Sequence, residues 1–247
     1  MKILSISTAT SDLSIALSDL SIALNEADHL VSEKIEENQR NHSVDLDPDI
    51  ASLLAENGLS LKDIDRFAVA IGPGSYTGLR VGLTTAKMFA SILNKELVGV
   101  STLQALAQNF AGEDALIVAA LDARNKNFFA GAYRGKEAVI ADGHYHLSEL
   151  LEQVGALPDQ KVIFVGSDFS KYQEEIAAGL ADKDLRLAEG EENLLHAGAI
   201  GRLAVSAPVL DPDQAVPNYL RRTQAEYDWA KKTGQEFEAD SAYVEEV

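Results

Sequence analysis

The chain has 247 residues, of which 39 are acidic and 21 basic, so its formal net charge is −18. Hydrophobic residues make up 46% and charged residues 24%, a balance that indicates a folded domain and excludes a collagen-like repeat, a coiled coil or a disordered chain. The absence of cysteine excludes disulfides, iron–sulfur clusters, thiolate zinc sites and a cysteine nucleophile.

The charge and the apolar runs also bear on binding and location. A protein that binds nucleic acid by itself usually has a basic face, so an acidic chain needs a more basic partner for that task. No signal-peptide pattern opens the sequence, and the longest apolar run, residues 115–121, is too short to span a bilayer. We therefore expect a cytoplasmic protein that does not bind membranes.

The first half of the sequence predicts strands followed by helices. Periodicity predicts strands over residues 2–8, 13–17, 29–35, 67–71 and 98–100, and helices over 44–57, 77–93 and 102–109. Gly58 suits the end of the first helix. The heptapeptide SDLSIAL occurs twice in succession, at 11–17 and 18–24. Because seven is odd, one continuous strand would turn the second copy to the opposite face, so we expect a turn near Asp19 or a displaced copy.

The second half repeats this architecture. It predicts strands over residues 115–122, 128–133 and 161–165, and helices over 148–154, 171–180 and 193–205. Each half opens with a buried strand, a polar turn and a second strand, and the turn follows Ser7 in one half and Asp122 in the other. We therefore predict an internal duplication of an α/β unit. From Asp228 onward the chain is acidic, poor in apolar residues and expected to be mobile.

A glycine-rich segment, residues 72–78, separates a predicted strand from the longest predicted helix. Such a turn can present backbone N–H groups to an anion, but it lacks the lysine of a P-loop and the spacing of a nucleophile elbow. Composition alone favours a tight, closely packed turn. The residues that follow form a row of small side chains at every fourth position: Gly78, Gly82, Ala86 and Ala90. This row can pack against the chain's own sheet or dock another chain, and the sequence leaves both possibilities open.

Only a few polar side chains in the sequence are candidates for a catalytic or metal site. Asp122 follows a buried strand, where an aspartate can hold magnesium-bound phosphate or simply close a hairpin turn. His144 and His146 are too few for a metal site and are interpreted as surface residues. His42 has Leu46 four residues later, so a helical metal-binding histidine pair is missing.

Six blocks of sequence, in this order, resemble the bacterial TsaB (YeaZ) family. They are ILSISTAT (3–10), RNHS (40–43), GPGSYTGLRVG (72–82), VSTL (100–103), LDAR (121–124) and PNYLR (217–221). Two features depart from that family. Ser7 stands where the family usually has aspartate, which weakens any nucleotide site, and the heptapeptide duplication has no familiar counterpart.

The resemblance implies an actin-like/Hsp70-like ATPase fold, of the ribonuclease H-like α/β class, with two similar subdomains. We expect these at residues 1–110 and 111–225, with the last helix returning to the first subdomain and an acidic tail at 226–247. A degenerate nucleotide cleft would lie at Ser7, Thr8, Gly74 and Asp122, with no metal ligands and no catalytic residues.

The resemblance also implies a function without catalysis. The family takes part in forming N6-threonylcarbamoyladenosine in tRNA, beside the anticodon, as the partner of the catalytic paralogue TsaD. The ATPase TsaE joins the complex, ATP and a divalent metal belong to these partners, and tRNA is reached only through the complex. We expect a homodimer when the partner is absent. The partner face would comprise Leu46, Ile50, Leu53, Gly78, Leu79, Gly82, Leu83, Ala86 and Ala90.

Three alternatives remain at this point. They are an actin-like-fold ATPase or kinase, a glycoprotease-like hydrolase, and a homodimeric scaffold unrelated to tRNA. If the small-residue row docks a partner, Ala86→Arg should leave folding intact while weakening partner binding and dimerisation at least tenfold.

Overall fold

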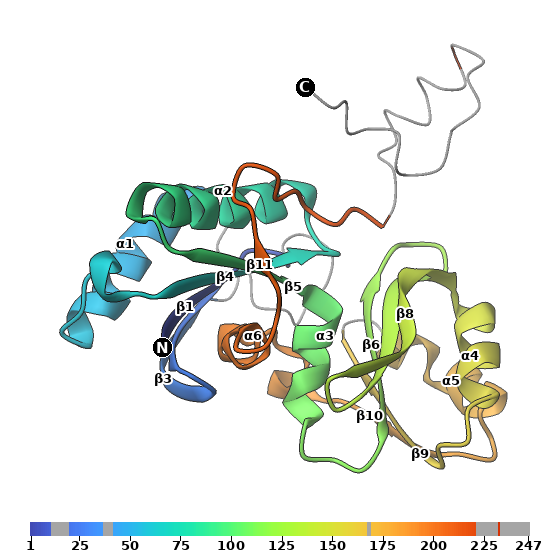
Figure 1. The fold of residues 1–247 in the computed structure, drawn as a ribbon. Coiled ribbons are helices and arrows are strands. Elements are labelled where there is room, and N and C mark those ends of the chain that lie inside the picture. Colours follow the sequence, from blue (N-terminus) through green and yellow to red (C-terminus); the bar gives the residue numbers. More distant parts are fainter. Residues whose placement is uncertain (11–19, 37–41, 167–168, 221–231, 233–247) are drawn as a thin grey trace.

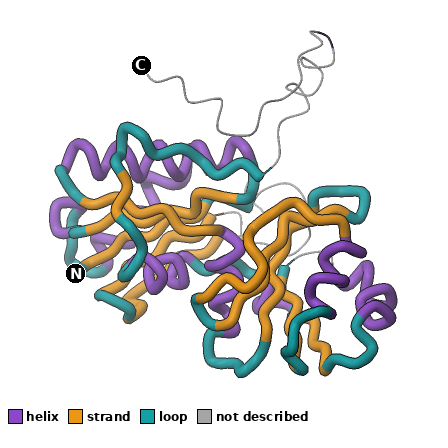
Figure 2. Tube along the Cα trace, turned by 45° about the vertical axis from the view of Figure 1, so that its right-hand side comes forward, coloured by secondary structure: helices purple, strands orange, loops and turns teal. Residues whose placement is uncertain are grey.

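The computed structural model describes residues 1–10, 20–36, 42–166, 169–220 and 232. Two mixed β-sheets, each covered by helices, stand side by side (Figures 1 and 2). Among the described residues, no helix combines the length and the apolar character needed to cross a membrane.

The first sheet is built from both ends of the chain. Its strands are β1 (Lys2–Ser7), β2 (Leu20–Glu26), β3 (His29–Glu36), β4 (Arg66–Gly72), β5 (Glu96–Ser101) and β11 (Val209–Leu210). The order across the sheet is β11-β5-β4-β1-β2-β3. Strands β1, β2 and β3 pair antiparallel, whereas β4 lies parallel to both β1 and β5.

The second sheet has the same plan. Its strands are β6 (Leu116–Asp122), β7 (Asn127–Arg134), β8 (Glu137–His146), β9 (Lys161–Val165) and β10 (Asp184–Leu187). The order is β10-β9-β6-β7-β8, with β6, β7 and β8 antiparallel and β9 parallel to β6 and β10. In both sheets the five strands of the unit therefore follow the order 3-2-1-4-5. This repeated topology confirms the predicted duplication of an α/β unit.

The helices divide the faces of the two sheets between them. They are α1 (His42–Glu56), α2 (Tyr76–Leu93), α3 (Thr102–Ala107), α4 (Leu147–Gly155), α5 (Gln173–Gly179) and α6 (Ala197–Ala204), with short 3-10 turns at Leu61–Asp63, Gln108–Phe110, Phe169–Tyr172 and Gly190–Asn193. Leu4 and Ile6 of β1 pack in one cluster with α1 and α2, while Ile3 packs in another with α3 and α6. This alternation follows from the two-residue period of a strand.

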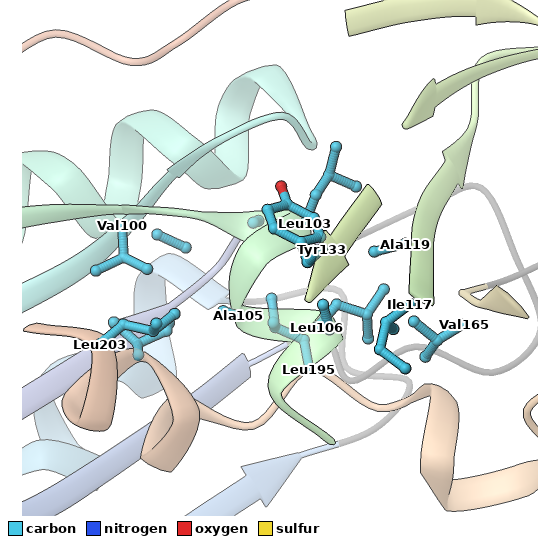
Figure 3. Packing of buried hydrophobic residues seen from close by; sticks show 14 of the residues in the cluster. Val100, Leu103, Ala105, Leu106, Ile117, Ala119, Tyr133, Val165, Leu195 and Leu203 are labelled. Carbon is cyan, nitrogen blue, oxygen red and sulfur yellow. The ribbon is translucent and has the colours of Figure 1, made fainter. Parts of the chain in front are cut away.

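Helix α3 lies between the two sheets and joins their cores (Figure 3). Leu103 and Leu106 of α3 share one buried cluster with Ile117 of β6 and Val165 of β9, and with Leu203 of α6. Helix α6 comes from the second half of the sequence, yet it packs on β1 and β2 of the first sheet. The halves are therefore held together by apolar packing as well as by the chain.

The described structure departs from the sequence prediction at several elements. Strands β8, β10 and β11 were not predicted, because they are short or interrupted by glycine and polar residues. The predicted helix over 193–205 is wrong in its first part: Asn193 turns inward, and its amide group bonds Gly166 N and Ala188 O. In the duplicated heptapeptide, Leu20–Leu24 of the second copy lies in β2, while the first copy at 11–17 and the expected turn lie outside the described residues.

Candidate functional site

Thr8 directly follows β1 and connects that strand to helix α2. Its hydroxyl donates to the carbonyl of Gly78 at 2.6 Å and accepts from the N–H of Gly82 at 3.1 Å. These two backbone groups are four residues apart, the spacing at which helical groups bond each other. A Cβ at Gly78 would overlap the Thr8 carbonyl, and one at Gly82 would overlap the Thr8 hydroxyl. Both glycines therefore make room for β1.

The rest of the glycine-rich segment is packed in the same way. Gly74 lies against Ala9, and a Cβ at Gly74 would overlap the carbonyl oxygen of Ala9. That same oxygen accepts a hydrogen bond from Ser75 N at 2.6 Å. Ser75 caps α2 by accepting from Gly78 N at 3.3 Å. Ser7 is 2% exposed. Three of the four residues predicted for a degenerate nucleotide cleft are thus brought together, in a tightly packed turn. This is the packing interpretation that composition favoured.

Asp122, the fourth predicted cleft residue, lies at the corresponding turn of the second sheet. Its Oδ1 accepts from Arg124 N at 3.1 Å, the arrangement of an aspartate that closes a hairpin turn. Among the described residues, no group of three or more histidine, aspartate or glutamate side chains is arranged to hold a metal ion. His146 instead caps α4 through Ser148, and His144 packs against the ring of Phe129.

The nine residues expected at the partner face all point into the chain's own core. They are Leu46, Ile50, Leu53, Gly78, Leu79, Gly82, Leu83, Ala86 and Ala90, and each is buried. Helical spacing shows which residues share a face, but not which face turns inward. The reason for placing a docking groove on the small residues therefore does not hold, because Thr8 and the first sheet, chiefly β4 and β1, already cover that groove. The complete burial of Ala86 also argues against the expectation that Ala86→Arg would fold normally.

The opposite side of α2 carries an exposed row, again at every fourth residue. The row comprises Tyr76, Arg80, Thr84, Met88 and Ile92. Tyr76, Met88 and Ile92 are 45%, 42% and 74% exposed, which is unusual for large apolar side chains. Helix α2 contains no acidic residue, although the chain as a whole is strongly acidic. The sequence alone contains this row, because the same four-residue spacing read from Tyr76, two residues before Gly78, gives the opposite side of the helix.

A C-terminal segment, residues 215–219, borders this row, and we call it the strap. Tyr219 stacks on Tyr76 with ring centroids 5.1 Å apart, and its hydroxyl accepts from Arg80 Nε at 2.9 Å. The Arg80 guanidinium also lies 4.3 Å from the centre of the Tyr76 ring. Asn218 N donates to Ile71 O at 2.7 Å, so the strap is anchored beside the glycine-rich segment. Residues from two separated sequence blocks, Tyr76 and Arg80 from one and Asn218 and Tyr219 from the other, therefore lie together on one surface.

Helix α1 lies next to α2 and differs from it in charge. It contains aspartate and glutamate but no lysine or arginine. Asp47, Ala51 and Ala55 are exposed and four residues apart, so α1 presents small side chains outward beside an acidic residue. The outer faces of α1 and α2, together with the strap, form what we call the α1–α2 face.

Comparison with known proteins defines the class. Residues 29–229 match the family described as TsaD: tRNA N6-adenosine threonylcarbamoyltransferase. In structure, the chain resembles YeaZ from Pseudomonas aeruginosa with a TM-score of 0.68 and 24% identity, covering 89% of this chain and 99% of that one. The fold is thus a duplicated α/β fold with two similar halves, as the family resemblance implied, in the form seen in YeaZ.

Sequence relatives identify the family within that class. The tRNA threonylcarbamoyladenosine biosynthesis protein TsaB of Bacillus subtilis is 34% identical over 233 residues, 93% of this chain and 98% of its own length. The protein of the same name from Escherichia coli is 29% identical over 245 residues, 96% of this chain and 100% of its own length. The chain belongs to the TsaB family of tRNA threonylcarbamoyladenosine biosynthesis proteins, which is related to TsaD.

Proposed function

We propose that this protein is a non-catalytic docking subunit for a TsaD-like threonylcarbamoyl transferase, in the modification of tRNA adenosine beside the anticodon. Membership of the TsaB family supports the pathway. The packed turn around Thr8 and Gly74 supports the absence of catalysis, because the Thr8 hydroxyl is bonded to the backbone of α2 and Gly74 is packed against Ala9.

The exposed row of α2 is the observation that carries the proposal. Apolar side chains this exposed are typical of a surface that another protein covers. The row has no acidic residue that would have to lose its water against an apolar partner, and Arg80 within it can pair with a partner's carboxylate. The strap adds the aromatic ring of Tyr219 to the same surface. Residues that bind the partner are therefore proposed on the outer sides of α1 and α2, opposite to the small-residue row.

The same face suits a second copy when the transferase is absent. A two-fold axis can place the acidic α1 of one copy against the basic α2 of the other, and the reverse contact follows by symmetry. The exposed Ala51 and Ala55 let a helix approach closely. We therefore propose a homodimer that competes with the transferase for one surface.

The remaining parts of the proposal concern partners and cofactors. ATP and a divalent metal would belong to the transferase and to a TsaE-like ATPase, and this chain would need no cofactor of its own. A net charge of −18 opposes direct contact with tRNA phosphates, so tRNA would be bound through the complex. A cytoplasmic location agrees with that role.

The test is the affinity of the purified chain for a purified TsaD-like transferase. Met88→Glu adds a charge to the exposed row without filling the core, and we expect binding and self-association to weaken at least tenfold. Val31→Glu is the matched control, because Val31 is 50% exposed but lies on β3. Unchanged binding by Met88→Glu, with the same melting temperature as the wild type, would contradict the proposal.

A further inference from the structure

Asp142 on β8 lies where the two halves of the molecule meet. Its carboxylate accepts from the hydroxyl of Tyr133 on β7, and its other oxygen accepts from the hydroxyl of Ser101. Ser101 belongs to the first sheet: it ends β5 and caps α3 by accepting from Gln104 N at 3.2 Å. One carboxylate therefore joins the second sheet to the start of the helix between the sheets.

The local backbone is shaped to aim this side chain. In the β7–β8 pair, Ala130 is opposite Gly143 and Ala132 is opposite Ile140, so two residues of β8 face one residue of β7. Such a bulge redirects a side chain. The single residue of β7 at this point is Gly131, whose Cβ would overlap Asp142 Oδ1. The bulge and the glycine together admit the carboxylate.

The turn of the same hairpin is also bound across the boundary. The side chain of Gln104 on α3 donates to Lys136 O at 2.9 Å, and Gln108 donates to Gly135 O at 2.7 Å. Each bond runs from the segment after β5 to the β7–β8 turn. Polar contacts thus hold this hairpin at its turn and in the middle of β8, beside the apolar cluster that the halves share.

We propose that Asp142 is a latch between the two halves, which fixes the β7–β8 hairpin to the start of α3 and so holds the sheets in one relative arrangement. The proposal is independent of the partner that the α1–α2 face binds. The pKa of Asp142 is raised, because its burial outweighs the opposing effect of the bonds from Ser101 and Tyr133. A latched chain presents both halves to any partner as one rigid body.

The test uses the absence of cysteine. Lys62→Cys near the first sheet and Glu152→Cys on α4 place two spin labels on exposed sites in opposite halves, with no background thiol. Double electron–electron resonance then measures the distribution of distances between the two labels. We compare the unchanged chain with Ser101→Gly, with Asp142→Asn and with the double variant. Glycine keeps most of the capping ability at Ser101 but removes the hydroxyl.

We expect a single narrow distribution for the unchanged chain and a broader or shifted one for each variant. The double variant should be no broader than the worse single one, because both changes remove the same contact. Tyr145→Phe is the control, since that hydroxyl bonds Ala141 O within β8. Wild-type distributions in folded Ser101→Gly and Asp142→Asn would overturn the proposal. If Asp142→Asn does not fold, the distance distribution of Ser101→Gly alone tests the proposal.

Discussion

The two halves of the molecule share a topology but differ in what they present to solvent. In the first half, α1 and α2 have 15 and 18 residues, whereas α4 and α5 of the second half have 9 and 7. The large hydrophobic side chains that are exposed among the described residues lie in residues 1–110 or after 208, and none lies between. Duplication thus gave two similar scaffolds, of which one retains an apolar outer surface.

The halves also resemble each other in fine detail where strands end. A glycine with a positive φ stands where the fourth strand of each unit ends: Gly72 is the last residue of β4 (+126°), and Gly166 directly follows β9 (+125°). In both, a Cβ would overlap a backbone carbonyl, that of Asn218 in one half and of Ala120 in the other. The difference is that Gly72 makes room for the strap, a segment from outside its own unit. This contact extends the outer surface of the first half only.

The largest expected effect separates the inner and outer faces of α2. Ala86 is completely buried, so Ala86→Arg should lower the free energy of unfolding by roughly 3 kcal/mol or more, through overpacking and a buried charge. Ala177→Arg on the exposed side of α5 is the control and should change stability little. Denaturant unfolding measures both. A stable, well-folded Ala86→Arg would show that the small-residue row is not packed against the first sheet.

The next effect concerns the bond that places α2 against β1. Thr8→Val keeps the side-chain shape but removes the hydroxyl that bridges Gly78 and Gly82. Losing the two hydrogen bonds of this buried hydroxyl should cost about 1–3 kcal/mol. Thr84→Val, on the exposed row of the same helix, should cost much less. Equal losses in the two variants would argue against the bridging role of Thr8.

These residues show how far the sequence alone could predict the structure. Repeated strand–turn–strand patterns predicted the duplicated fold, and the four-residue spacing correctly grouped Gly78, Gly82, Ala86 and Ala90. The spacing could not reveal the direction of that face, because direction depends on the strand packed against it. The contact between Tyr76 and Tyr219 joins positions far apart in sequence, and no local pattern predicts it. Strand β8 was missed because its bulge at Asp142 interrupts the alternation.

A smaller, pH-dependent effect is expected where α6 returns to the first sheet. Glu33 of β3 accepts from Gly198 N at 2.9 Å, and its other oxygen lies 3.0 Å from His196 Nδ1. Burial acts to raise the pKa of Glu33, but the bonds from His196, Gly198 and Ser21 and the charge of His196 outweigh it and lower the pKa. A lowered pKa stabilises the fold above the ordinary glutamate value of about 4.3, and this stability is lost as the pH falls through the lower folded value.

Glu33→Gln tests this contribution. The variant should melt at a lower temperature than the wild type at pH 7, and the difference should shrink as the pH falls below about 4.3. Thermal melts across pH 3–7 measure it. A difference that does not vary over this range would assign the effect of the substitution to packing and not to the charge.

Thiol labelling tests most directly whether the outer side of the first half is the docking surface. Because the chain has no cysteine, Thr84→Cys on the exposed row and Glu152→Cys on α4 each provide a single reactive thiol. With a saturating TsaD-like transferase, we predict that labelling of Thr84→Cys slows at least tenfold while that of Glu152→Cys stays unchanged. Protection of Glu152→Cys with Thr84→Cys left accessible, in a complex that still forms, would contradict the account.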